Sequence, residues 1–197
     1  ENPTKSVDLN FKVLNKILEH LNKNTKVIFL SSVAGIPKSA SYYGKSKFQI
    51  SEKLYNWYET SIFVCGLIIT DNKNSPFQFL KRFYEKVFLP IKFGNKIKIL
   101  FVESNQVINA IYEKIINFKK GIFRLYEDED ISLDSFIKKN SNLKRNTYIN
   151  ISLFLSFFLI IAKYINYIPF INKITDKLIT LITNNKLKTD EFIKKGF

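Results

Sequence analysis

Cysteine and histidine are nearly absent from this sequence, in which Cys65 and His20 are the only residues of their kinds. A single cysteine cannot form a disulfide within the chain, and this pair cannot build a Cys/His zinc site. Ser–His or Cys–His catalysis would need His20, which lies in an expected helix and is predicted to be a surface residue. We therefore expect no metal site, and a reducing, cytoplasmic setting fits the cysteine content.

Methionine is absent altogether, and the first residue is Glu1. We therefore expect the chain to be part of a longer protein. Hydrophobic residues make up 46% of the sequence, which is enough to bury a sizeable core and argues against a disordered chain.

Arginine is scarce, although the formal net charge is +14. Arg82, Arg124 and Arg145 are the only arginines, whereas base-edge recognition and bidentate phosphate binding favour arginine over lysine. The lysines are scattered along the chain rather than gathered in one stripe. A solvated basic surface is therefore favoured over a nucleic-acid partner.

Apolar spacing in the first third of the sequence alternates between helical and strand patterns. Leucines and isoleucines recur at helical spacing before residue 22, whereas VIFL and SIFV are short apolar runs typical of buried parallel strands. This alternation predicts an α/β fold with a parallel sheet and crossover helices. The expected elements are a helix at 6–22, a strand at 26–32, a loop at 33–41, a helix at 42–58 and a strand at 61–69.

The polar, turn-rich segment 70–76 is predicted to separate this part of the chain from a second lobe. Beyond it, helical patterns predominate and the apolar runs are short. The expected elements are a helix at 77–87, a strand at 97–104, a helix at 105–118, a strand at 121–126 and a helix at 131–139.

Residues 149–171 form the most apolar stretch of the sequence. A membrane-spanning helix needs about 20 apolar residues, and Lys163 and Pro169 interrupt this one. A buried or groove-lining helix is therefore favoured, and peripheral membrane contact through this stretch is kept as an alternative.

Tyr43 and Lys47 form the pattern in the sequence that points most directly to chemistry. They are four residues apart at the start of an expected helix, so their side chains share one helical face. A free phenol has a pKa of about 10, and a nearby ammonium favours the phenolate and is expected to lower that pKa. The pair could therefore transfer protons without a histidine.

The position of Tyr43 and Lys47 in the expected fold strengthens the prediction that they are catalytic. Tyr43 is the only tyrosine followed by lysine four residues later, and it comes after a strand that ends in Ser31-Ser32. Parallel α/β sheets place their chemistry at the carboxyl ends of the strands. A serine hydroxyl there could hydrogen-bond the same substrate oxygen as Tyr43.

The run FLSSVAG, followed by SASYYGKSKFQISEKL, resembles the catalytic serine and Tyr-x-x-x-Lys segment of the extended short-chain dehydrogenase/reductase family. Tyr-Gly-Lys-Ser-Lys is particularly similar to UDP-galactose 4-epimerase-like members, the NAD-dependent epimerase/dehydratase group. VCGLIIT resembles the strand after the catalytic helix, and LFVESNQVINAIYEKI resembles a later segment that returns to the nucleotide-binding lobe. The similarity covers most of the chain, but only the serine and Tyr-x-x-x-Lys part is specific.

This resemblance implies a partial Rossmann-like parallel sheet in residues 1–70 that binds NAD or NADP. Residues 71–197 are then a smaller, mostly helical lobe for a nucleotide-sugar, with 97–118 returning to the Rossmann lobe.

The same resemblance assigns roles to individual residues. Tyr43 is the acid/base and Lys47 its electrostatic partner, and both contact the cofactor, the lysine at the nicotinamide ribose. Ser32, the second serine of the pair, is the catalytic hydroxyl.

Three features depart from the family pattern. The glycine-rich phosphate-binding turn and the acidic residue that follows it are missing and are expected upstream of Glu1. Val64-Cys65 stand where many relatives carry Arg-Pro, a position that bears on how the sugar nucleotide is held. Val33-Ala34 stand where sugar-nucleotide dehydratases place Asp-Glu, so an epimerase or a reductase is favoured over a dehydratase.

The resulting prediction is an NAD(P)-dependent nucleotide-sugar epimerase in the cytoplasm, with a homodimer left open as its assembly. A one-way keto-sugar reductase of the same fold is the first alternative. A non-catalytic, membrane-associated remnant is the second, because the chain lacks the cofactor-binding turn and carries a +14 charge.

Overall fold

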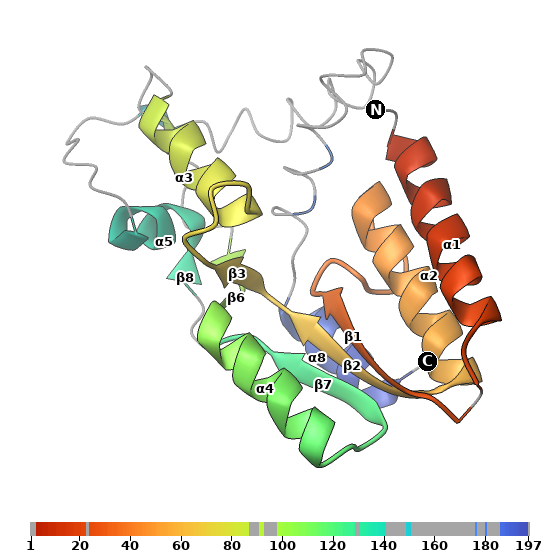
Figure 1. The fold of residues 1–197 in the computed structure, drawn as a ribbon. Helices are drawn as coiled ribbons and strands as arrows, with labels where there is room; N and C mark the ends of the chain where they lie inside the picture. The colour runs from red at the N-terminus through yellow and green to blue at the C-terminus, as the bar shows by residue number, and fades with distance from the viewer. Residues whose placement is uncertain are drawn as a thin grey trace.

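A central parallel sheet of three strands organises the first part of the chain (Figure 1). The computed structural model describes residues 3–22, 24–86, 91–92, 98–128, 131–140, 149–150, 176, 180 and 186–196. Strand β1 (Lys26–Ser32) pairs with β2 (Glu59–Cys65), and β2 pairs with β7 (Gly121–Leu125). The strand order is β1-β2-β7, and both pairings are parallel, so the predicted α/β class with a parallel sheet is confirmed.

Helices connect these strands, as parallel pairing requires. Helix α1 (Pro3–Glu19) and α2 (Tyr42–Trp57) lie side by side next to β1, and α4 (Ser104–Ile116) runs along β7 (Figure 1). The rings of Phe63 in β2 and Phe123 in β7 pack in a tilted arrangement with their centroids 5.8 Å apart. The Lys114 ammonium of α4 lies 4.5 Å from the centroid of the Phe123 ring. Helix α8 (Lys186–Lys195) packs on β7 and contributes Phe192 to the core.

The predicted strand at 61–69 is wrong in one respect, because the structure divides it at Gly66. Strand β3 (Leu67–Ile69) leaves the main sheet and pairs in parallel with β6 (Phe101–Glu103). A Cβ atom on Gly66 would lie 2.6 Å from the Leu100 carbonyl oxygen, so only glycine allows this close approach of two backbones. The Leu67 amide donates to that same oxygen at 2.7 Å, and this fixes the crossing point.

Two other predicted elements divide in a similar way. The strand expected at 97–104 is β5 (Lys98–Ile99) and β6, which are interrupted at Leu100. The helix expected at 131–139 begins with β8 (Ile131–Ser132), which pairs antiparallel with β5, and continues as α5 (Leu133–Asn140). In both cases a short strand partner selects the conformation, and partners distant in sequence are invisible to periodicity.

Two hydrophobic clusters hold these elements together. The first packs α3 (Pro76–Lys86) and α5 against the short strands, with Phe136 fully buried at its centre. The second lies under the carboxyl ends of β2 and β7 and contains Val64, Tyr126 and Phe192. Leu100 belongs to the second cluster while its neighbours Ile99 and Phe101 belong to the first, so this segment joins the two.

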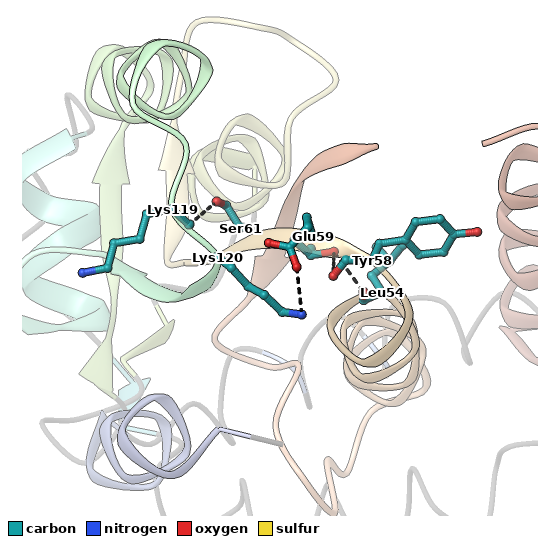
Figure 2. Close-up of polar contacts among 7 residues, drawn as sticks. Leu54, Tyr58, Glu59, Ser61, Lys119 and Lys120 are labelled. Carbon is teal, nitrogen blue, oxygen red and sulfur yellow. Dashed lines mark hydrogen bonds and ion pairs between the residues drawn. The ribbon is translucent and has the colours of Figure 1, made fainter. Parts of the chain in front are cut away.

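Polar contacts connect the elements at the amino-terminal ends of β2 and β7, at the opposite end of the sheet from the second cluster (Figure 2). The buried Ser61 hydroxyl donates to the Lys119 carbonyl at 2.6 Å, and the Lys120 ammonium lies 3.6 Å from the Glu59 carboxylate. At the end of α2, the amide of the C-cap residue Tyr58 donates to the Leu54 carbonyl oxygen at 3.0 Å. The contacts of Ser61 and Glu59 join β2 to the segment before β7, so they stabilise the sheet at the end remote from Ser32.

The apolar stretch 149–171 lies outside the described residues except for β9 (Ile149–Asn150), which pairs in parallel with β4 (Ile91–Lys92). Within the part of the chain that the structure describes, no helix combines the length and apolar character needed to cross a bilayer.

Candidate active site

The first turn of α2 carries Tyr43 and is built around Gly44. Ser41 is the N-cap residue, and its hydroxyl oxygen accepts a hydrogen bond from the Gly44 amide at 3.0 Å. A Cβ atom on Gly44 would lie 2.3 Å from the Ala34 carbonyl oxygen and 2.0 Å from the Ser39 hydroxyl. The loop after β1 therefore packs directly on this turn and places Tyr43 beside the end of the strand.

The two serines at the end of β1 have different surroundings. Ser31 is buried, and its hydroxyl oxygen accepts a hydrogen bond from the Ser51 hydroxyl at 2.9 Å, which ties α2 to the strand. Ser32 is half-buried, its oxygen accepts from the Ala34 amide at 3.3 Å, and its side chain hydrogen-bonds Tyr43. The structure thus brings Ser32, and not Ser31, to the phenol.

Lys47 lies one helical turn after Tyr43, on the same side of α2. Its ammonium donates to the Leu30 carbonyl at 2.8 Å and lies 4.8 Å from the centroid of the Phe29 ring. The distance from the ammonium to the centroid of the Tyr43 ring is 5.9 Å. All three residues selected from the sequence, Ser32, Tyr43 and Lys47, therefore meet at the carboxyl end of β1.

Tyr43 is 46% exposed as a whole residue, but its phenol group is desolvated by the residues around it, and this raises the pKa of the phenol above its ordinary value. The hydrogen bond from Ser32 opposes this rise, and the nearby Cys65 thiol adds to it. Burial also lowers the pKa of Lys47. The pKa of Tyr43 is therefore raised overall and not lowered as the sequence predicted, because desolvation of the phenol outweighs the influences that favour the phenolate.

Cys65 ends β2 and is the register partner of Ser32 in the neighbouring strand. Its side chain is buried, and its thiol donates to the Phe63 carbonyl at 3.6 Å. Burial raises the pKa of the thiol to about 12, and the charge of Lys47 opposes that rise. Cys65 thus contributes a neutral, buried side chain to the site.

The raised pKa predicts that Cys65 is chemically inert in the folded chain. The ordinary pKa of the thiol is 9.0 and the folded value is about 12, so near pH 8 the thiolate fraction falls about 10³-fold on folding. We expect Ellman's reagent to modify the native chain about 10³-fold more slowly than the urea-denatured chain. Equal rates in the two states would contradict the burial of this thiol.

Asp176 is a residue of this site that sequence reasoning missed. Its carboxylate accepts hydrogen bonds from the backbone amides of Tyr42, at 2.7 Å, and Tyr43, at 3.2 Å. The carboxylate and these amides are 133 and 134 residues apart in the chain, so no local pattern could have indicated the contact.

Comparison of the sequence with protein-family models and with curated proteins gives no match. Comparison with solved structures does. The chain is similar to the UDP-glucose 4-epimerase of Thermotoga maritima, solved with UDP-glucose, with a TM-score of 0.56 and 14% identity over 76% of this chain and 58% of that one. The chain therefore spans well under two thirds of that epimerase.

Two further solved structures have comparable similarity. The protein gox2253 has a TM-score of 0.61 and 11% identity, and the match covers 100% of this chain and 69% of that one. The UDP-N-acetylglucosamine 4-epimerase of Methanobrevibacter ruminantium M1, in complex with UDP-N-acetylmuramic acid, has a TM-score of 0.50 and 13% identity. That match covers 96% of this chain and 69% of the epimerase. At this level of identity the likeness concerns the fold, and the chain has the Rossmann-like fold found in these UDP-sugar 4-epimerases.

Proposed function

We propose that this chain forms part of an NAD(P)-dependent nucleotide-sugar epimerase with Tyr43 as its acid/base. The observation that carries the proposal is the meeting of Ser32, Tyr43 and Lys47 at the carboxyl end of β1, where Ser32 favours the Tyr43 phenolate and the Lys47 ammonium lies 5.9 Å from the centroid of the Tyr43 ring. Parallel sheets bind ligands at this edge. The fold shared with two UDP-sugar 4-epimerases supports a nucleotide-sugar as the substrate.

The donor groups of the site fit one end of the implied cofactor. A phenol and an ammonium both suit the hydroxyls of the nicotinamide ribose, and the ammonium of Lys47 has three N–H donors, of which the Leu30 carbonyl takes one. The six glycines of the sequence contain no G-x-G-x-x-G turn for the diphosphate. Tyr43 and Lys47 are therefore proposed to hold the ribose end.

Each residue has a separate task in the proposed reaction. When bound, NAD(P) supplies the hydride acceptor and donor. Tyr43 removes the proton from a sugar hydroxyl and later returns it, and Ser32 donates a hydrogen bond to the same sugar oxygen. Lys47 stabilises the negative charge on the phenolate, which is needed because burial alone disfavours ionisation.

The division of the chain is part of the same proposal. Residues 1–70 would hold the catalytic part of the Rossmann lobe and 71–197 the nucleotide-sugar lobe, with 97–118 returning to the first. The parallel pairing of β7 with β2 supports such a return, because the chain re-enters the sheet directly after α4.

The balance of products tests the proposal. The native protein that contains this chain is incubated with NAD and either UDP-glucose or UDP-N-acetylglucosamine, and the products are separated by anion-exchange chromatography. We expect each active substrate to yield its 4-epimer without a net change in absorbance at the NADH band. Stoichiometric consumption of NADH or NADPH with a keto-sugar would favour the reductase alternative. If neither kind of turnover occurs, the proposed activity is wrong for these sugars.

A further inference from the structure

The backbone amides at the start of α2 are bound from two separate parts of the chain. The Lys45 amide makes the first intrahelical hydrogen bond, to the Ser41 carbonyl at 3.0 Å. The three preceding amides have no acceptor within the helix: the Ser41 hydroxyl accepts from the Gly44 amide, and the Asp176 carboxylate accepts from the amides of Tyr42 and Tyr43. These three amides of the first turn are therefore all satisfied.

The position of Asp176 is itself supported by a second contact. The Thr180 hydroxyl donates to the Asp176 carbonyl oxygen at 2.7 Å. This bond joins two residues that are four apart and both helical, so it holds the Asp176 backbone in place. The contact with α2 is therefore an anchor between segments far apart in sequence.

The anchor acts on the residue that matters most for the proposed reaction. One of the two amides it binds belongs to Tyr43, whose side chain must keep its hydroxyl at Ser32. The carboxylate also places a negative charge at the positive end of the α2 dipole. That charge offsets a field that would otherwise favour the phenolate.

We propose that Asp176 is a positioning residue for Tyr43, which holds the first turn of the catalytic helix in place and adjusts the charge at its start. The role of Asp176 in catalysis rests on the proposed function. Its hydrogen bonds to the amides of Tyr42 and Tyr43 do not depend on that proposal. Among the residues that the structure describes, the groups that face the phenol are Ser32 from β1, Cys65 from β2 and Lys47 from α2. None of these is altered in the variants below.

Two variants separate the hydrogen bonds from the charge. Asp176→Asn keeps an acceptor oxygen but removes the negative charge, and Asp176→Ala removes both. Glu52→Gln is the matched control, because Glu52 is exposed on the same helix and its substitution removes the same charge far from the first turn. The chain is labelled with 3-fluorotyrosine, and the Tyr43 fluorine signal is identified by its loss in Tyr43→Phe.

Titration of that signal measures the effect on the phenol without any need for turnover. In Asp176→Asn we expect the pKa of the fluorinated phenol to fall, because the positive end of the helix dipole is no longer offset by the carboxylate. In Asp176→Ala we expect faster amide hydrogen exchange at residues 42 and 43, with partial protection retained in Asp176→Asn. Neither change is expected in Glu52→Gln.

The inference is overturned if the Tyr43 signal titrates identically in Asp176→Asn and Glu52→Gln, or if exchange at residues 42 and 43 is the same in Asp176→Ala as in the unaltered chain. An altered Tyr43 titration in a protein that turns over no nucleotide-sugar would support the anchor and refute the proposed function. Turnover of a nucleotide-sugar together with an unaltered Tyr43 titration would support the proposed function and refute the anchor.

Discussion

Replacement of Tyr43 by phenylalanine is expected to lower kcat by about 10² to 10⁴, the range that general acid–base groups contribute. The substitution removes only the hydroxyl, the group that hydrogen-bonds Ser32 and that we propose to exchange a proton with the sugar. The ring remains, so the first turn of α2 and its contact with the Lys47 ammonium should survive. The initial rate of nucleotide-sugar epimerisation measures the change, and circular dichroism verifies that the chain is folded.

Tyr42→Phe is the matched control for this variant. Tyr42 is the adjacent residue in the same turn, is as exposed as Tyr43 (42% against 46%), and loses the same hydroxyl on substitution. We expect its turnover to stay within about twofold of the unaltered protein, because its hydroxyl has no task in the proposed reaction. Equal turnover in the two variants would contradict the assignment of Tyr43 as the acid/base.

Replacement of Gly44 by alanine is expected to destabilise the fold by about 3 kcal/mol or more, at the upper end of overpacking substitutions. The new Cβ would lie 2.3 Å from the Ala34 carbonyl oxygen. The Ser39 hydroxyl can rotate away from the Cβ, but the carbonyl belongs to backbone that is packed against the helix. A gain of about 1 kcal/mol in helix propensity offsets only part of this cost.

Thermal unfolding measures this prediction. A loss of about 3 kcal/mol corresponds to a fall in Tm of roughly 6 to 12 °C for a chain of this size. Gln49→Ala, at an exposed position of the same helix, should leave Tm nearly unchanged or slightly raised. An unchanged Tm in Gly44→Ala would mean that the loop after β1 does not rest on the first turn of α2.

Much of the fold followed from local patterns. The strand expected at 26–32 is β1 with the same limits, and the helix expected at 42–58 is α2 to within one residue. Both have strong signals, one a short apolar run between polar turns and the other a long amphipathic segment after a loop with small residues. Parallel pairing followed as well, because alternating helices and strands leave few other arrangements.

The strand breaks at Gly66 and Leu100 could not be predicted in the same way. Each break exists because the other segment passes close to it, with the Leu67 amide bound to the Leu100 carbonyl. Apolar runs on either side read as continuous strands, since periodicity records which residues are buried and not which strand lies beside them.

For the candidate site, the sequence by itself determined that Tyr43 and Lys47 share a helical face, because a spacing of four in a helix leaves no alternative. Only the tertiary structure decided that Ser32 rather than Ser31 meets the phenol, because that choice depends on how α2 packs across β1. It also decided that burial raises the pKa of Tyr43 and that Asp176 binds the start of its helix. Desolvation and long-range hydrogen bonds arise from neighbours in space, and the order of residues along the chain does not specify those neighbours.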